Sequence, residues 1–171
     1  GGLGFSAWAD ENNCFIVAPG FKDDEYWQPE KWSGKALLSA LDEIGKSYRI
    51  SKDHLLCYGY SAGSQCSNLF PAWKPQIFTA WVSHACGVFH KPDKKMASCP
   101  GLVTCGEADI GRYQLSRKFV TDSRRLGVPI LWKTFPNTQH DVPPDSVSLA
   151  KAFLKYHHAE NLSELEPGYQ A

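Results

Sequence analysis

The fold of this chain is decided by the stretch Leu55-Leu56-Cys57-Tyr58-Gly59-Tyr60-Ser61-Ala62-Gly63, an apolar run that ends in the pattern Gly-x-Ser-x-Gly. Helix-tolerant residues follow it, from Ser64 to Phe70. A strand, a tight turn and a helix are the context in which this pattern places a serine at the apex of the turn. So sharp a turn strains the serine backbone and is expected to require glycine at both Gly59 and Gly63. The pattern therefore predicts that the Ser61 hydroxyl stands clear of the sheet.

The neighbours of Ser61 are candidates for contact with a reacting group. The backbone N–H of Ala62 lies at the start of the expected helix, where it can point at an oxyanion that develops beside the serine. Tyr60, on the other side of the serine, is a candidate for substrate contact. Glycine and serine are common residues, so an ordinary glycine-rich turn is the alternative. The strand-like run before the turn and the helix after it favour the first interpretation.

Length and composition are those of an ordinary globular chain. The 171 residues suggest a single domain over 1–171, with a polar tail at 161–171, and 43% of them are hydrophobic. The formal net charge is zero and no basic stripe is present, which argues against a nucleic-acid partner. No apolar run approaches the roughly 20 residues of a membrane span. The first residues, Gly1-Gly2-Leu3-Gly4-Phe5, carry no basic n-region of the kind that begins a signal peptide. The compartment and the oligomeric state stay open.

The six cysteines suggest no metal site. Cys14, Cys57 and Cys105 lie inside apolar strand-like runs, where cysteine usually packs as a small hydrophobe. Cys86 and Cys99 flank a loop-like stretch, and they could form a disulfide in an oxidising compartment, with free thiols as the alternative. The spacing of the six fits no zinc motif.

Strand-like and helix-like segments alternate along the chain without an internal repeat. This alternation predicts an α/β fold, with a mostly parallel sheet and helices on both faces. In such sheets, ligands bind beyond the carboxyl ends of the strands. The expected strands are 14–18, which should be buried on both faces, the run from Leu55, and 77–83, 101–105 and 130–135; the expected helices are 2–12, 34–48, 64–70, 112–126 and one that begins at Asp145.

Two residues further along the chain could activate Ser61. A serine hydroxyl needs a base to take its proton and an acid to orient that base. Asp109 and His140 each follow an expected strand, so both should lie at the same edge of the sheet as Ser61, and their order along the chain is typical of this arrangement. The alternatives are that Asp109 caps the helix near Arg112 and that His140 is a solvated loop residue.

Two other carboxylates compete with Asp109 for the role of acid. Glu107 follows its strand at once, so the alternation of the strand still sets its direction. Asp141 is adjacent to His140, and adjacent side chains generally diverge. Asp109 lies far enough beyond the strand to turn back toward the base, and is the preferred acid.

Further side chains are expected near the same edge. His84 and His90 lie in the segment 84–100, where contact with a substrate is one interpretation and a purely structural role the other. Tyr26, Trp27 and Trp32 follow the first expected strand, and simple burial of these large rings is the alternative to lining a cleft. If they line it, they favour an apolar or aromatic ester.

The segment 34–142 resembles the α/β-hydrolase superfamily, and is most similar to poly(3-hydroxybutyrate) depolymerases and feruloyl esterases. The matching features are the helix 36–48, the stretch 49–53, the turn Gly59–Gly63, the sequence Gly106-Glu107-Ala108-Asp109 and the His140 loop. The resemblance implies a serine esterase with no metal and no organic cofactor, acting on a small-molecule or polymeric ester. It implies that Ser61 is the nucleophile, His140 the base and Asp109 the acid that orients it. A secreted or periplasmic location is compatible with it.

The start of the chain departs from this resemblance. Relatives have strands before the first helix, including a central strand that ends in a His-Gly loop and supplies a second oxyanion donor. Gly1-Gly2 resembles the remnant of that loop, and the central strand is absent. Buried backbone groups of the neighbouring strands would then lack partners, at roughly 1–3 kcal/mol each. We therefore expect the native chain to extend beyond Gly1 by at least one strand.

Two other functions are alternatives to an esterase. A serine peptidase of the same fold must protonate a leaving amine and usually has a gating domain, for which this length leaves no room. A non-catalytic binding module of the same fold typically lacks one of the three residues, whereas this chain has Ser61, Asp109 and His140.

Overall fold

The fold is seen in a computed structural model, which describes residues 2–165 and the side chains of residues 3–159. Four strands form one sheet in the order β1-β2-β3-β4, and every neighbouring pair is parallel. The strands are β1 (Leu55–Tyr60), β2 (Phe78–His84), β3 (Gly101–Gly106) and β4 (Ile130–Phe135).

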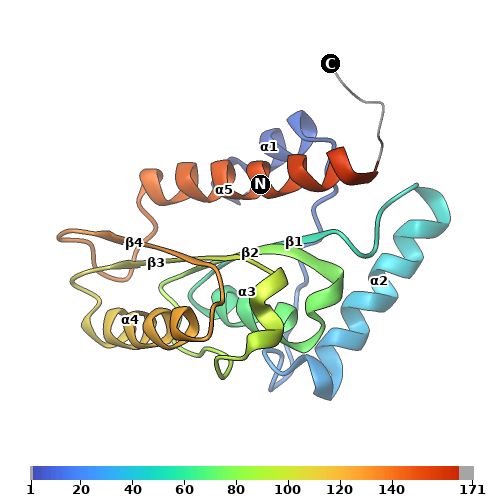
Figure 1. The fold of residues 1–171 in the computed structure, drawn as a ribbon. Coiled ribbons are helices and arrows are strands. Elements are labelled where there is room, and N and C mark those ends of the chain that lie inside the picture. Colours follow the sequence, from blue (N-terminus) through green and yellow to red (C-terminus); the bar gives the residue numbers. More distant parts are fainter. Residues whose placement is uncertain (1, 166–171) are drawn as a thin grey trace.

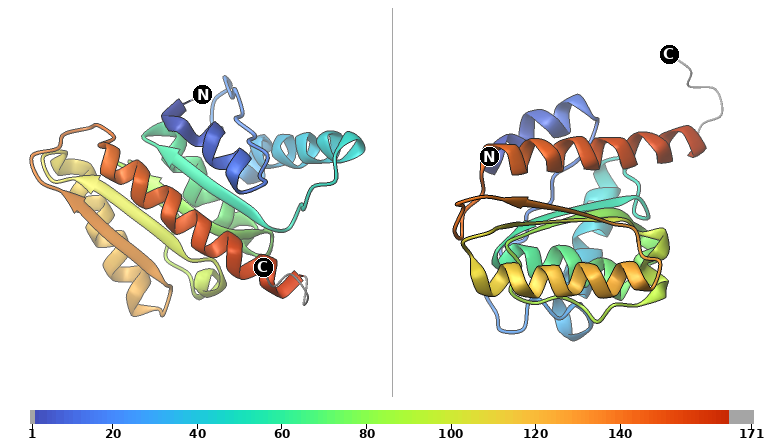
Figure 2. Two further views of the ribbon diagram at one scale, coloured as in Figure 1. Left: turned by 90° about the horizontal axis from the view of Figure 1, so that it is seen from above. Right: turned by 60° about the vertical axis from the view of Figure 1, so that its left-hand side comes forward.

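Helices lie on both sides of this sheet (Figure 1). On one side are α1 (Phe5–Glu11) and α5 (Pro144–Leu165), and on the other are α2 (Gly34–Ser47), α3 (Ala62–Trp73) and α4 (Ile110–Arg125). The left view of Figure 2 shows α2 beyond the β1 edge of the sheet. The predicted α/β fold, with a parallel sheet between helices, is confirmed. Four short helical turns complete the description: η1 (Gly2–Gly4), the π-helical η2 (Pro29–Ser33), η3 (Pro75–Ile77) and η4 (Lys94–Ser98).

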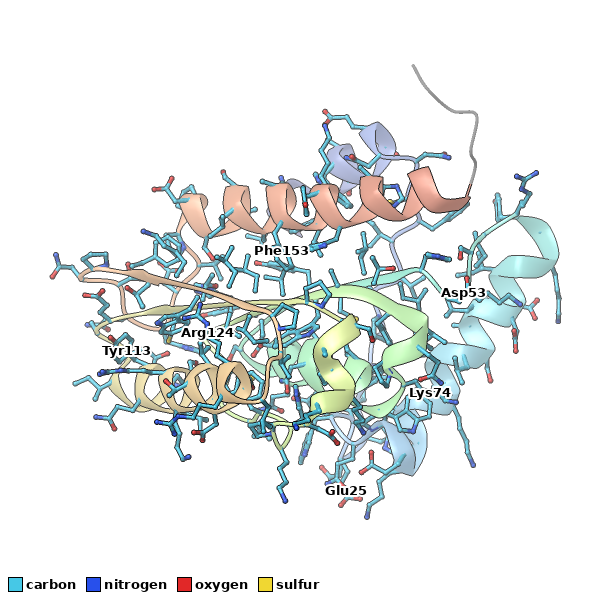
Figure 3. All side chains as sticks on the ribbon, viewed as in Figure 1. Glu25, Asp53, Lys74, Tyr113, Arg124 and Phe153 are labelled. Carbon is cyan, nitrogen blue, oxygen red and sulfur yellow. The ribbon has the colours of Figure 1, made fainter. Side chains whose placement is uncertain are left out.

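The sheet separates two apolar cores. Trp81 and Val103 belong to the core between the sheet and α3 and α4, whereas Val82 and Leu102 belong to the core beneath α5. Successive strand residues point to opposite faces, so β2 and β3 supply both cores. Every residue of β3 is buried, as expected for an inner strand of a parallel sheet. Figure 3 shows Phe153 of α5 among the side chains that fill the space between that helix and the sheet.

The apolar run 14–18 is not a strand, so this prediction is wrong. The Cys14 backbone N–H instead donates to the Ala9 carbonyl at 2.8 Å, which closes α1. Phe15 and Ile16 are 55% and 52% exposed, and the Phe15 ring lies 5.0 Å from that of Tyr48. A strand needs a neighbour for its N–H and C=O groups. Among the described residues none pairs with this run, because the sheet ends at β1.

Three further expectations concern the ends of elements and the cysteines. The segment that carries Tyr26, Trp27 and Trp32 ends in the π-helical turn η2, and α5 continues to Leu165. The first part of the expected tail, 161–165, is thus helical, and 166–171 lie outside the described residues. All six cysteines are free thiols, so the disulfide considered between Cys86 and Cys99 is not formed. Within residues 2–165, no helix is both long and apolar enough to cross a membrane.

His90 is a titratable side chain inside the α3 and α4 core. It is 8% exposed, lies against the rings of Trp81 and Phe119, and its Nδ1 is 3.2 Å from the Asn68 Oδ1. Burial lowers the pKa of His90 from 6.5 to about 4. Between these two values the unfolded chain binds a proton that the folded chain does not. The free energy of unfolding is therefore highest above pH 6.5, as far as His90 is concerned. This contribution of His90 is lost as the pH falls toward 4.

We predict that the free energy of unfolding falls by about 2 kcal/mol between pH 7 and pH 5 through His90 alone. Replacing this residue, His90→Phe, keeps a ring between Trp81 and Phe119 and should remove that part of the slope. Burial also lowers the pKa of His84, and the contribution of His84 to the pH dependence of stability should be the same in both proteins. Urea titrations of wild type and variant at both pH values measure the difference. Equal losses in the two proteins would contradict the assignment.

Candidate active site

Ser61 lies between the end of β1 and the start of α3, as predicted. Its φ is 51° and its ψ is −114°, a left-handed backbone conformation that is uncommon for a residue with a side chain. Its backbone N–H donates to the His84 carbonyl at 3.0 Å, and its carbonyl accepts the Ser64 N–H at 3.1 Å. Hydrogen bonds on both sides of the peptide therefore hold the strained turn in place.

The two glycines of the turn are not equivalent. A Cβ on Gly59 would lie 2.1 Å from the Gly63 carbonyl oxygen, so no other residue fits there without a backbone shift. A Cβ on Gly63 would meet nothing within 4 Å. The expectation that both positions must be glycine is thus correct for Gly59 alone. The close approach is between the backbone at Gly63 and the α-carbon of Gly59.

Three side chains from three strand ends form a continuous chain of hydrogen bonds. The Ser61 Oγ is 2.8 Å from the His140 Nε2, and the His140 Nδ1 is 2.8 Å from the Asp109 Oδ2. A carboxylate only accepts hydrogen bonds, so Nδ1 carries the proton of the neutral ring and Nε2 is free to accept from the serine hydroxyl. The His140 side chain is 34% exposed and that of Asp109 is 9% exposed. The imidazole of His140 is thus open to solvent, while the carboxylate of Asp109 is largely covered.

Asp109 immediately precedes α4, but its side chain makes no capping hydrogen bond. Its second carboxylate oxygen, Oδ1, instead lies 3.3 Å from the Arg112 Nη1. The carboxylate therefore bridges the imidazole of His140 and a guanidinium. The helix-capping alternative for Asp109 does not describe this geometry.

The competing carboxylates have other partners. The Glu107 Oε1 accepts a hydrogen bond from the Thr134 hydroxyl at 2.7 Å. The Asp141 Oδ1 accepts the Val142 backbone N–H at 2.7 Å. Neither carboxylate is engaged with the ring of His140, which the structure instead places beside Asp109.

Ala62 and Tyr60 flank the serine in different environments. Ala62 is exposed and is the first residue of α3, so its N–H belongs to the turn whose donors have no partner within a helix. The Tyr60 hydroxyl donates to the His140 carbonyl at 2.9 Å, and the two rings are 5.1 Å apart. Tyr60 thus contacts the loop that carries His140, a contact that its position in the sequence did not suggest.

His84 is not available to a substrate, so this interpretation is wrong. It is the last residue of β2, not part of the following loop, and it is fully buried. Its Nε2 lies 2.6 Å from the Asp141 carbonyl oxygen. The sequence reveals that a strand ends here, but not that the last side chain is covered by another loop.

Trp27 is brought to a different part of the surface. It lines a cavity of about 570 Å³ together with Leu69 and Trp73. Ser61, Asp109 and His140 do not line this cavity. At 1.5 Å per residue, Leu69 lies about 12 Å along α3 from Ser61. The expected contribution of Trp27 to the cleft beside Ser61 is therefore not seen in this arrangement.

Two residues of the site were missed in the sequence. Arg112 lies one helical turn after Asp109, a spacing that suggests the contact only once the helix boundary is known. Gly106 ends β3, and a Cβ there would be 2.2 Å from the Thr138 carbonyl oxygen. The loop that carries His140 thus packs directly on the strand end. Among the described residues, no group of three or more His, Cys, Asp or Glu side chains could hold a metal ion.

Comparison with solved structures gives the class of fold. The chain is similar to an uncharacterized protein from Bacillus cereus ATCC 10987 (TM-score 0.71), the S-formylglutathione hydrolase of Staphylococcus aureus (0.68) and a CE1 ferulic acid esterase of the anaerobic fungus Anaeromyces mucronatus (0.64), each 16% identical in sequence. The matches cover 90%, 90% and 85% of this chain, and 53%, 72% and 60% of those chains. No protein-family model matches the sequence, and no curated protein matches it.

The chain therefore has the α/β-hydrolase fold. It spans about half the length of the Bacillus cereus protein, 53%. The turn at Ser61 and the parallel strands that end beside it are the part of the fold that bears on function.

The contrast between the two glycines can be tested directly. We expect Gly59→Ala to lower the free energy of unfolding by about 3 kcal/mol or more, because the new methyl group overlaps backbone atoms. In Gly63→Ala, the matched control, the stability should be unchanged or raised by up to about 1 kcal/mol. Urea unfolding of both variants gives the comparison. Equal destabilisation would mean that the turn needs both glycines.

Proposed function

We propose that this chain carries the catalytic residues of a serine hydrolase that cleaves carboxylic esters through an acyl-enzyme. The observation that supports this most is the unbroken series Asp109, His140 and Ser61, with 2.8 Å at each step. The series ends on a serine whose backbone is strained and whose neighbour Ala62 begins a helix. A nucleophile, its base and the group that orients the base are the parts that acyl transfer requires.

In the first half of the proposed reaction, the Ser61 Oγ attacks the carbonyl carbon of the ester. Its proton moves to the His140 Nε2, and the carbonyl π electrons move to oxygen. The Ala62 N–H donates to that oxyanion, assisted by the positive end of α3. When the tetrahedral intermediate collapses, the carbon–oxygen bond to the alcohol breaks. Nε2 returns the proton to the leaving oxygen, and the acyl group remains on Ser61.

In the second half, water attacks the acyl carbon and gives its proton to the same nitrogen. Collapse then releases the acid and returns the proton to the Ser61 Oγ. Asp109 holds Nδ1–H throughout, so that Nε2 faces the serine, and its charge stabilises the imidazolium formed in each half. Arg112, 3.3 Å from the other oxygen of that carboxylate, keeps it from rotating away from the ring.

An ester is the substrate class that best fits the site and its relatives. Two of the similar structures are a ferulic acid esterase and an S-formylglutathione hydrolase. An alkoxide leaves more readily than an amine, so ester cleavage makes smaller demands on the protonation of the leaving group. A peptidase and a binding module of the same fold remain the other outcomes of the assay below.

We predict that Ser61→Ala abolishes the hydrolysis of p-nitrophenyl acetate while urea unfolding stays at wild-type stability. The hydroxyl stands at the apex of the turn and makes no core contact, and loss of such a residue costs several orders of magnitude in rate. Ser51→Ala, at an exposed position before β1, is the matched control and should be fully active. Turnover above about a tenth of wild type in the Ser61 variant would refute the assignment. Cleavage of a peptide anilide in place of the ester would identify a peptidase, and no turnover of either a binding module.

We predict that Asp109→Asn lowers kcat by about 10⁴-fold, because the ring of His140 then loses its orientation and the imidazolium its counter-charge. Glu107→Gln and Asp141→Asn change other carboxylates of the same region in the same way, and should stay within about threefold of wild type. Circular dichroism establishes that each variant is folded. A folded, active Asp109→Asn beside an inactive variant of either other acid would transfer the role to that residue.

A further inference from the structure

A network of polar groups lies behind the site, centred on His84. This histidine is fully buried. It lies two residues after Val82, which belongs to the apolar core beneath α5. Its Nδ1 lies 2.8 Å from the Ser146 hydroxyl, in the first turn of α5, and also contacts the Thr104 hydroxyl. Its Nε2 lies 2.6 Å from the carbonyl oxygen of Asp141. One imidazole thus joins two strands, a helix and the loop that carries His140.

The partners of His84 determine where its proton lies. The Asp141 carbonyl can only accept, so Nε2 must carry the hydrogen and donate it. Burial lowers the pKa of His84, which favours the neutral ring, and in that form Nδ1 accepts from the hydroxyl of Ser146 or Thr104. These two hydroxyls are 3.2 Å apart, so one can donate to the ring and the other to its neighbour. Both ring nitrogens of this buried histidine have a partner, which fixes both the tautomer and the orientation of the ring.

Tyr60 makes a second contact of the same kind. Its hydroxyl donates to the carbonyl oxygen of His140 at 2.9 Å, so the two successive carbonyls of the loop, at His140 and Asp141, are both held. The donors come from adjacent strands, because Tyr60 pairs with His84 in the register of β1 and β2. Thr104 is the partner of His84 on β3, so the three side chains form one row across the sheet.

We propose that His84 is a positioning residue for the reaction, and that, together with Tyr60, it fixes the backbone of the loop that carries His140. The inference rests on the proposed function, since it assigns a role in the reaction of Ser61. Besides these two contacts, the loop packs on Gly106 at the end of β3, and its Thr138 carbonyl accepts the Ala108 N–H at 2.9 Å. His140 itself is bound through its side chain to groups that must change partners during the reaction. A fixed backbone keeps Nε2 within reach of Ser61 while those side-chain hydrogen bonds exchange.

The test compares two replacements of the same residue. His84→Leu removes the donor to the Asp141 carbonyl, and kcat should fall by about 10²-fold, as for a catalytic group displaced by about 1 Å. KM for p-nitrophenyl acetate should stay within about threefold, because His84 does not touch the substrate. His84→Gln retains an N–H donor of similar reach and an acceptor oxygen, and should recover most of the lost kcat. His90→Gln, at the other buried histidine, is the control and should leave kcat unchanged.

A second measurement needs no substrate. Backbone amide exchange in residues 137–142 should become faster in His84→Leu and return toward wild type in His84→Gln, with no change there in His90→Gln. If wild type cleaves no ester, the proposed function fails, whereas the exchange result still decides whether His84 holds the loop. If wild type is active, a folded His84→Leu with unchanged kcat or unchanged exchange overturns the inference. A folded His84→Gln as impaired as His84→Leu also overturns it, because hydrogen bonding would then not be the cause.

Should His84→Leu fail to fold, Tyr60→Phe keeps the inference open to refutation. This variant loses only the hydroxyl that holds the His140 carbonyl, and we expect kcat to fall by about tenfold, with faster amide exchange in residues 137–142. Unchanged kcat together with unchanged exchange in a folded Tyr60→Phe would overturn the proposal.

Discussion

The in-register alignment of the parallel strands is the constraint on which the rest of this structure depends. Because β1, β2 and β3 run in the same direction, Tyr60 and His84, the last residues of β1 and β2, fall side by side with Thr104 of β3. The residues after those ends, including Ser61 and Asp109, are therefore delivered to one edge of the sheet. A slip of one residue in any pair would move the polar row to the opposite face and separate it from α5. The burial of β2 and β3 on both faces makes such a slip costly.

The strained turn at Ser61 is stable because its surroundings over-determine it. A positive φ at a serine costs of order 1 kcal/mol or more. This cost is offset by the hydrogen bond to the His84 carbonyl and by helix α3, which begins at once. The close packing of Gly59 against the backbone of Gly63 belongs to the same turn. His84 thus serves the site through its carbonyl on the serine side and through its imidazole on the loop side.

Much of this could be predicted from the sequence, because local signals identify local structure. The strand, turn and helix around Ser61, the later alternation of strands and helices, and the proximity of Asp109 and His140 follow from apolar runs and their order. What failed depends on distant partners. The run 14–18 has the composition of a buried strand but no strand beside it, and composition does not contain that information. The position of His84 and Trp27 after strand-like runs suggests contact with a substrate. In the structure, His84 is covered by α5 and the His140 loop, and Trp27 lies beside the C-terminal half of α3.

The hydrogen bond between the Tyr60 hydroxyl and the His140 carbonyl has a consequence for how the site loses its freedom of motion. Tyr60 directly precedes Ser61 in the chain, and its hydroxyl is hydrogen-bonded to the backbone of His140. The Tyr60 side chain thus links the positions of Ser61 and His140 directly, in addition to the long path through β2, β3 and β4. The orientational entropy of that pair is lost once, during folding, and not again each time a molecule arrives. Any chemistry that uses both groups therefore starts from a frame that is already assembled.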